Sequence, residues 1–339
     1  MKYYLIFIVS LILFSCQEEI TLDLPQAEMK LVVEGAIEPG FPPYVILTQN
    51  QAYFDEIDID TYSDLFVNNV DTVKVWYYKD SGEKEIKFLS KIEGVDSLPT
   101  IFTDLSYDFS GNFPYYFSQE EKTYYLEIKW NSQIITAETT IPKSTPLDCL
   151  WVEQSETADK DFKCDIRAIY SDPADIQNNI IIKSRRIQHY SFSEDSCKTK
   201  DIPDFPLQLI DAGSDILVNG ESFETYFPKP KENGFPTGAY NSMREEECSD
   251  GNILEIKEDI VLIKFSQIDE ASLKFWRGLI RQRGTNGNPF SEPKNLVSNI
   301  NGGLGVWTGY SPVYYKVPIV KETTIFGDSI YTPKIEDIF

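Results

Sequence analysis

The sequence predicts a mainly β protein made of two β-sandwich domains, of which the first is immunoglobulin-like and the second is larger and carries one amphipathic helix. Aromatic residues make up 14% of the chain and accompany many Val, Ile and Thr, and these residue types are enriched in strands. Short runs of alternating apolar and polar residues are separated by polar turns, as in sandwiches of short strands. The length of 339 residues exceeds what one hydrophobic core usually serves, so two domains are expected.

Residues 1–15 are predicted to be a lipoprotein signal peptide. Lys2 precedes an apolar run of about 13 residues, which is shorter than the roughly 20 residues of a transmembrane helix. The run ends in Leu-Phe-Ser-Cys, where a signal peptidase would cut before Cys16. Cys16 is therefore the predicted lipidation site, and its acyl chains, of the palmitate kind, would hold the protein in a lipid bilayer. An ordinary signal peptide whose cysteine forms a disulfide is the alternative.

Residues 16–27 are expected to form a lipidated tether, and residues 28–145 the immunoglobulin-like sandwich. Gly82 lies in a predicted hairpin turn, where glycine supplies a positive φ at low cost. A second turn at Asn131 joins the last two strands, and prolines end the domain. The strands expected in this domain are residues 29–37, 44–48, 73–78, 85–89, 123–130 and 133–141.

The segment 53–66, between the second and third strands, combines acidic and aromatic side chains. The spacing of Asp58 and Asp60 is similar to the start of a calcium-binding loop. The residues that follow lack the Gly and the Glu that an EF-hand needs at its later positions. We therefore interpret the segment as a solvated acidic loop, and a rim for a partner is the alternative that the sequence leaves open.

Residues 146–339 are expected to form the larger sandwich, with a long irregular insertion at 191–254. Loops of this length tend to be functional or disordered, so the insertion is a candidate contact surface. The helix is predicted at 269–283, because Asp269 suits the N-cap and the apolar residues around Trp276 share one face. The strands expected in this domain are residues 147–152, 162–170, 178–184 and 256–265.

A glycine-rich stretch at 302–305 is the closest approach to a nucleotide-binding motif in the chain. A phosphate-binding loop would continue into a helix that begins with Gly-Lys-Ser or Gly-Lys-Thr, whereas a β-type sequence follows here. These glycines therefore predict a tight turn at the start of a strand.

Four cysteines follow the lipidation site, namely Cys149, Cys164, Cys197 and Cys248. An exported chain meets an oxidising compartment, so an even number predicts two disulfides. Three connectivities are open, and we prefer Cys149–Cys164 across a predicted hairpin and Cys197–Cys248 across the long insertion. A zinc site is the alternative. It is disfavoured because no Cys-x-x-Cys spacing occurs and His189 is the only histidine.

Charge and motif content limit the possible functions. The formal net charge of −23 repels phosphate backbones, so no nucleic-acid partner is expected. A Ser-His-Asp triad would have to use His189, and no nucleophile-elbow motif supports one. We therefore predict that the protein is not an enzyme, with no catalytic residue, no cofactor and no metal site. A surface hydrolase is the least favoured alternative.

Several short motifs together resemble a known family. They are the lipobox at Cys16, residues 31–35, residues 137–142, the pair Asp172-Pro173 and residues 298–306. Through them the chain resembles the outer-membrane lipoproteins of domain-of-unknown-function family 4249. Members of that family are often encoded beside TonB-dependent receptors. The resemblance therefore implies an outer-membrane β-barrel partner, such as a TonB-dependent receptor, and no catalytic residues.

The predicted function follows from the anchor and the resemblance together. We expect a non-catalytic accessory or ligand-binding subunit of a TonB-dependent transporter or of an outer-membrane assembly complex. The acidic residues Glu18 and Glu19, directly after the lipidated cysteine, are similar to an export signal, so we expect the protein to face the cell exterior. A structural or adhesive surface module is the alternative.

Overall fold

The computed structural model of the protein describes most of the chain from residue 28 onward. The described residues are 28–51, 62–67, 69–93, 99–108, 115–154, 164–192, 200–201, 206–216, 218–230, 254–285, 296–319 and 322–334. Their regular elements are β-strands apart from the 3-10 helix η1 (Tyr62–Leu65) and the helix α3 (Glu270–Thr285), so the mainly β prediction is confirmed. No helix among them is long and apolar enough to cross a membrane.

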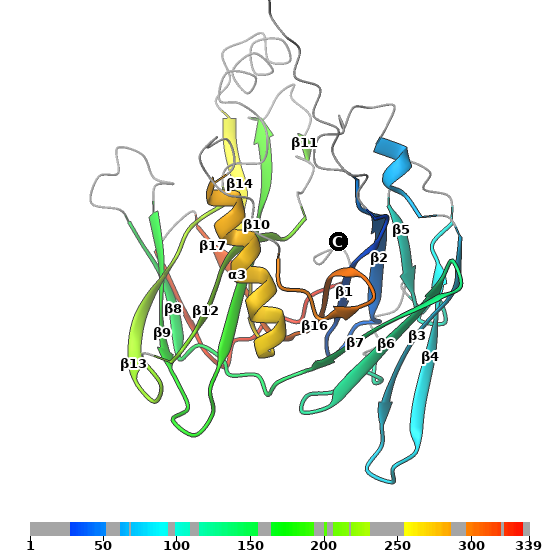
Figure 1. The fold of residues 1–339 in the computed structure, drawn as a ribbon. Helices are drawn as coiled ribbons and strands as arrows, with labels where there is room; N and C mark the ends of the chain where they lie inside the picture. The colour runs from blue at the N-terminus through cyan, green and yellow to red at the C-terminus, as the bar shows by residue number, and fades with distance from the viewer. Residues whose placement is uncertain are drawn as a thin grey trace, which may run out of the picture.

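The first sheet has nine strands in the order β15-β7-β6-β3-β4-β5-β2-β1-β16. Its two outermost strands, β15 and β16, follow each other in the chain, so the two edges meet and the sheet closes like a barrel (Figure 1). Neighbours are antiparallel except β1 and β16, which run parallel. The strands are β1 (Leu31–Ile37), β2 (Tyr44–Gln49), β3 (Val70–Tyr78), β4 (Lys84–Lys91), β5 (Thr100–Thr103), β6 (Thr123–Trp130), β7 (Gln133–Thr140), β15 (Ile300–Asn301) and β16 (Leu304–Gly309).

The core of this sheet is completed by the C-terminal half of the chain. Trp307 of β16 is fully buried among residues of β1, β3 and β6, and its indole nitrogen donates to the backbone oxygen of Tyr124 at 3.3 Å. Residues 300–309, which lie C-terminal to the predicted boundary at 145/146, supply β15 and β16 of the first sheet. This arrangement also differs from the two-sheet, immunoglobulin-like sandwich that we expected for 28–145.

Two further sheets face each other across a second core. One has the order β11-β10-β14-β17, with β12 also paired to β10, and the other has the order β13-β9-β8-β18. The four-stranded sheet contributes Leu150, Ile166 and Phe227 to this core, and the five-stranded sheet contributes Val261, Phe265 and Tyr315. The strands are β8 (Cys149–Gln154), β9 (Cys164–Ser171), β10 (Asn179–Phe192), β11 (Lys200–Asp201), β12 (Gln208–Ser214), β13 (Ser222–Phe227), β14 (Leu254–Gln267), β17 (Ser311–Pro318) and β18 (Thr323–Phe326).

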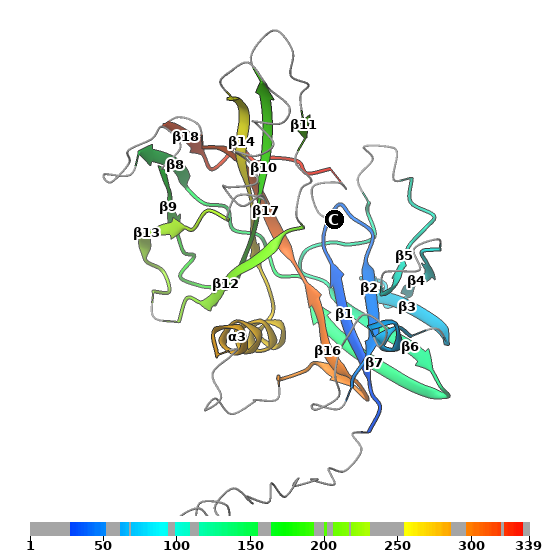
Figure 2. The ribbon, with the colours of Figure 1, turned by 90° about the horizontal axis from the view of Figure 1, so that it is seen from above.

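Helix α3 lies at the junction of these parts, against β10, β12 and β16 (Figure 2). Leu273 and Trp276 pack with Ile181 and Tyr310. The expected N-cap is confirmed, because Asp269 Oδ1 accepts the Ser272 N–H at 2.8 Å. Asp269 Oδ2 also accepts the Thr139 hydroxyl at 2.6 Å, so the cap ties the helix to the first sheet as well.

The long insertion predicted at 191–254 is more regular than expected in its described parts. Strand β12 extends the sheet beside β10, and β13 pairs with β9. Residues 216 and 218–220 form a turn, in which the Val218 N–H donates to the Asp215 backbone oxygen at 2.6 Å and Gly220 has a φ of 79°. The insertion therefore supplies edge strands, which become stable only by pairing with residues far away in the sequence.

The Cys149–Cys164 disulfide is contradicted by the register of β8 and β9. Cys149 lies opposite Ile169, and Cys164 lies opposite Gln154. Five residues of strand separate the two positions, roughly 16 Å at about 3.3 Å per residue. A disulfide requires Cα atoms within about 7 Å. The prediction is therefore wrong, because both cysteines lie in one hairpin but at opposite ends of it, and Cys149 carries a free thiol.

Candidate functional site

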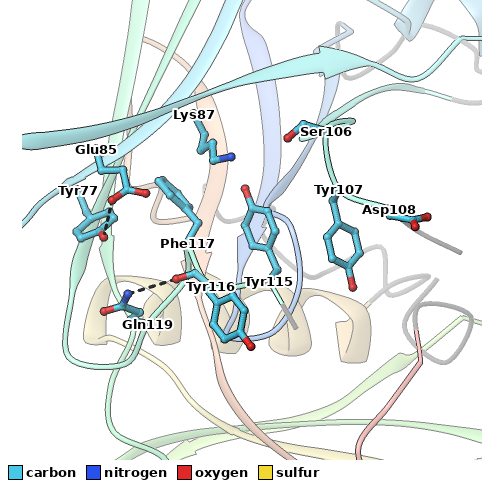
Figure 3. Close-up of a pocket in the computed structure, with 10 residues that line it drawn as sticks. All are labelled: Tyr77, Glu85, Lys87, Ser106, Tyr107, Asp108, Tyr115, Tyr116, Phe117 and Gln119. Atoms are coloured by element: carbon cyan, nitrogen blue, oxygen red, sulfur yellow. Dashed lines mark hydrogen bonds between the residues drawn. The ribbon is translucent and has the colours of Figure 1, made fainter. Parts of the chain in front are cut away.

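An open pocket of about 440 Å³ lies at one end of the barrel-like sheet, a volume within the usual range of ligand sites. Strands β3 and β4 form one wall, and the segments that follow β5 and precede β6 form the other (Figure 3). Half of the lining side chains are aromatic. The lining residues are Tyr77, Glu85, Lys87, Ser106, Tyr107, Asp108, Tyr115, Tyr116, Phe117 and Gln119.

The β3–β4 hairpin places charged residues on its inner side at this end. Lys87 lies opposite Val75, and Glu85 lies opposite Tyr77. Directly opposite residues share one face of a sheet, and Val75 faces the core, so Lys87 and Glu85 face inward too. Apolar and charged residues alternate along β4, as expected for a strand. The apolar residues Ile86 and Phe88, however, face outward, and Phe88 is 64% exposed.

Asp104 is the polar anchor behind the pocket, and it is only 4% exposed. Its carboxylate accepts the Tyr115 hydroxyl at 2.6 Å and the Ser106 N–H at 3.0 Å, and it pairs with the Lys87 ammonium at 3.0 Å. Burial alone would raise the pKa of Asp104, but the hydrogen bonds from Ser106, Tyr115 and Lys87 outweigh burial and lower it. Asp104 therefore remains an anion that holds three parts of the wall together.

A cluster of rings makes the wall before β6 rigid. Phe117 packs with Tyr77 at a centroid distance of 5.4 Å and with Tyr124 at 5.7 Å. The Tyr124 hydroxyl donates to the Phe117 oxygen at 2.9 Å and accepts the Gln119 N–H at 2.7 Å. Tyr124 thus holds the backbone that follows Tyr116 in place. The Tyr116 ring is nevertheless 77% exposed, so it is available to a ligand.

Two of the charged residues that line the pocket, Lys87 and Glu85, are paired with side chains just behind it. Lys87 pairs with Asp104, and Glu85 pairs with Lys79 at 3.2 Å and accepts the Tyr77 hydroxyl at 3.0 Å. Burial and then the hydrogen bond to Glu85 raise the pKa of Tyr77, so its phenol stays protonated. The pocket therefore offers hydrogen-bonding groups and aromatic faces without a large net charge.

A second polar cluster lies where the first sheet meets the five-stranded sheet. Lys264 and Glu38 form a buried ion pair, and the Tyr314 hydroxyl donates to Glu38 Oε1 at 2.7 Å. The Lys183 ammonium lies 4.9 Å from the centre of the Tyr310 ring. Burial, and then the charge of Lys264, lower the pKa of Lys183 to about 8. These contacts join the two parts of the molecule, and we assign them to structure.

Of the site residues predicted from the sequence, none in the described part of the chain lines the pocket. Cys16, Cys197 and Cys248 lie outside the described residues, as do Asp58 and Asp60, so lipidation, the Cys197–Cys248 bridge and the acidic loop stay predictions. His189 lies in β10, with its backbone opposite Glu258 of β14 and Asp201 of β11. No group of three His, Cys, Asp or Glu side chains suited to a metal ion occurs in the described ranges.

Sequence reasoning does not single out the pocket. Its aromatic residues between 107 and 117 lie outside regular strands, where no periodic pattern marks them. The one local signal is the hairpin itself, where Lys87 and Glu85 fall in register with core residues of β3. This signal can be recognised only when the register of β3 and β4 and the buried face of the hairpin are known.

The comparison with protein families gives one finding. The model of a family described as Domain of unknown function (DUF4249) matches residues 17–315 of the chain. No curated protein matches the chain.

Proposed function

The chain belongs to the DUF4249 family, and on this basis we propose that it is a non-catalytic accessory or ligand-binding subunit of an outer-membrane β-barrel, such as a TonB-dependent transporter or an assembly complex. In this proposal the acylated Cys16 anchors the protein in the outer membrane, facing the cell exterior. The lipobox at residues 13–16 and the acidic pair after it support the anchor and the orientation. The resemblance described above supports the β-barrel partner.

The pocket is the observation that carries the ligand-binding part of the proposal. It combines an exposed ring at Tyr116 with the polar groups of Glu85, Lys87 and Gln119. Aromatic faces beside a few fixed polar groups are typical of sites for small organic ligands. Because Lys87 and Glu85 are paired, we propose an uncharged ring compound with several hydroxyl groups, such as an oligosaccharide.

Binding fits this pocket better than catalysis does. Both oxygens of Asp104 accept hydrogen bonds, and Glu85 is held by Lys79 and Tyr77. A general acid or base must exchange its proton with substrate, and these carboxylates are already engaged by protein groups. The side chains instead fix the shape of the wall against which a ligand would rest.

The Tyr116→Ala variant tests the ligand site. The probes are maltoheptaose, cellohexaose and xylohexaose, and binding to the purified full chain is measured by titration calorimetry. We expect the variant to bind the recognised sugar at least about tenfold more weakly, a loss of roughly 1.4 kcal/mol, because the stacking ring is gone. Tyr116→Phe keeps the ring and should keep most of the affinity.

Tyr226→Ala is the matched control, since Tyr226 is 54% exposed on β13, away from the pocket. It should bind as the wild type does. Equal affinity of the Tyr116→Ala variant and the wild type would contradict the assignment of the pocket. Failure of the wild type to bind any of the three sugars would contradict the class of ligand proposed.

A further inference from the structure

Two buried carboxyl groups meet outside the pocket, where two connections run side by side. Asp172 follows β9 and is 6% exposed, and Asp215 follows β12 and is 3% exposed. The Asp215 N–H donates to the Asn178 oxygen at 3.2 Å, and the Asp172 N–H donates to the Glu221 oxygen at 3.1 Å. These bonds hold the two connections together, and Asn178 bridges the two carboxyl groups, because its side-chain amide donates to Asp172 and its N–H donates to Asp215.

Both oxygens of Asp172 already accept a hydrogen bond from an N–H group. Oδ1 accepts from the Asn178 side-chain amide at 2.9 Å, and Oδ2 accepts from the Gly220 N–H at 3.0 Å. Each of these donors points at an oxygen that must carry a lone pair. Asp172 is therefore satisfied as an anion.

Asp215 is bonded on one oxygen only. Its Oδ2 accepts the Asn178 N–H at 2.6 Å, whereas its Oδ1 is buried and has no hydrogen-bond partner of its own. Neither carboxyl group forms an ion pair with a Lys or Arg in the described part of the chain. Two adjacent buried anions without a compensating cation would repel each other strongly.

We propose that Asp172 and Asp215 form a buried acid pair that binds one proton at neutral pH, with the Oδ1–H of Asp215 donating to the Asp172 carboxylate. The proton resides on Asp215 because its Oδ1 is the oxygen that no N–H group approaches. This site is independent of the ligand pocket and of the membrane anchor. It closes the junction between the β9–β10 and β12–β13 connections.

The surroundings favour the protonated form. Burial raises the pKa of Asp215, the Asn178 N–H lowers it, and the charge of Asp172 raises it again, with a net increase. Titratable groups close to the pair include Tyr170 of β9 and the exposed Asp175 and Glu221, and none of these three is basic. Burial and then the charge of Asp172 raise the pKa of Tyr170, so its phenol stays neutral.

A metal ion would fit this place poorly. Calcium requires roughly six to eight oxygen ligands. Among the described side chains of residues 170–179 and 214–222, the buried oxygens without a hydrogen-bond partner are Asp215 Oδ1, the Tyr170 hydroxyl and Asn179 Oδ1, which are too few for calcium. A proton needs only one donor oxygen and one acceptor, and the two carboxyl groups supply both.

The acid pair makes stability depend on pH in a definite direction. An unfolded Asp has a pKa of about 3.9. The folded pKa of Asp215 is higher, so between the two values the folded chain holds more protons than the unfolded chain. The stabilising contribution is complete below the unfolded pKa and is lost as the pH rises through the folded pKa.

The test compares Asp215→Asn with Asp172→Asn by thermal unfolding of the full mature chain between pH 5 and pH 8. In Asp215→Asn the amide nitrogen takes the place of the protonated oxygen and donates to Asp172 at every pH. We expect its midpoint at pH 8 to equal or exceed that of the wild type, and its pH dependence to be flatter. In Asp172→Asn, one oxygen that accepts from an N–H group is replaced by an NH₂ group, which cannot accept. Two donors then face each other, so we expect the unfolding midpoint to fall by about 5 °C or more.

Carbon NMR of the aspartate carboxyl groups gives a second measurement that does not depend on stability. The wild type should show one carboxyl that titrates above the usual Asp range, and this signal should be missing in Asp215→Asn. Equal destabilisation by the two variants, or no such signal, would overturn the proposal. A rise of the wild-type midpoint on adding calcium that Asp215→Asn abolishes would also overturn it, in favour of a metal site.

Discussion

At the scale of single residues, the pocket depends on Asp104, whose buried carboxylate accepts from Tyr115 and Ser106 and pairs with Lys87. Hydrogen bonds to a charged group contribute more than neutral ones, about 1.5–3 kcal/mol each, and a partner left unpaired inside the protein costs a similar amount. The hydroxyl of Tyr115 and the ammonium of Lys87 are positioned for an anion. The charge of Asp104 is therefore part of the fold, and the shape of the pocket follows from it.

We predict that Asp104→Asn lowers the free energy of unfolding at pH 7 by about 2–3 kcal/mol, because the bonds at this position lose their charged acceptor. The pKa of Asp104 is lowered in the folded protein, so its contribution is present above the unfolded value of about 3.9 and is lost as the pH falls through the folded value. The difference between variant and wild type should therefore shrink in acid. Denaturant unfolding at pH 7 and pH 3 measures it.

Asp80→Asn is the control for this experiment. Asp80 also pairs with a lysine, Lys122, but its side chain is 93% exposed. Exposed ion pairs contribute little, so this variant should unfold like the wild type at both pH values. A similar loss in the two variants would show that the burial of Asp104 has no special effect.

At the scale of elements, β16 is the strand that closes the first sheet. It runs parallel to β1, with Gly305 opposite Val33. Gly305 has a φ of 102°, and a Cβ atom there would overlap the backbone oxygen of Val33. The strand can approach β1 this closely because position 305 has no side chain.

Gly305→Ala should therefore destabilise the protein by about 3 kcal/mol, since both backbone strain and a clash with β1 result. Gly82→Ala separates the two causes. Gly82 also has a positive φ, 81°, but nothing lies within 4 Å of an added Cβ atom. The second variant should lose clearly less stability than the first in denaturant unfolding. Equal losses would mean that the contact with Val33 has no role.

Local patterns in the sequence predict single elements well. The helix start at Asp269 follows from capping chemistry, and the strands around Val75 and Leu126 follow from alternation. Strand pairing is different, because it depends on residues far apart in the chain. The parallel neighbour of β1 and the opposite ends of the hairpin that hold Cys149 and Cys164 therefore could not be predicted from local patterns.

At the scale of the whole molecule, the chain leaves the first sheet after β7 and returns to it at β15 and β16. The return passes α3, whose Trp276 indole donates to the Thr308 hydroxyl of β16 at 3.1 Å. The buried pair of Lys264 and Glu38 crosses the same junction. The two parts of the molecule are therefore bound together by core residues and buried charges, and a partner would meet one connected body.

Among the features of the whole molecule, the anchor can be predicted from the sequence, whereas the pocket and the acid pair cannot. The lipobox is a contiguous motif, so the anchor is a prediction that the sequence makes by itself. The pocket is assembled from four segments between residues 77 and 119, and its polar residues gain meaning only from the register that brings Glu85 opposite Tyr77. The acid pair of Asp172 and Asp215 is similarly invisible until the two connections are placed side by side.

The most direct test of the proposed function is to isolate the protein, tagged at its C-terminus, from native outer membranes in mild detergent and to identify what co-purifies by mass spectrometry. We predict that a TonB-dependent β-barrel, or the barrel of an assembly complex, co-purifies in stoichiometric amount. Cys16→Ala should lose both the membrane fraction and the barrel, and Cys149→Ala should keep both. Recovery of the tagged protein alone, under conditions that preserve other membrane complexes, would contradict the proposed role as an accessory subunit.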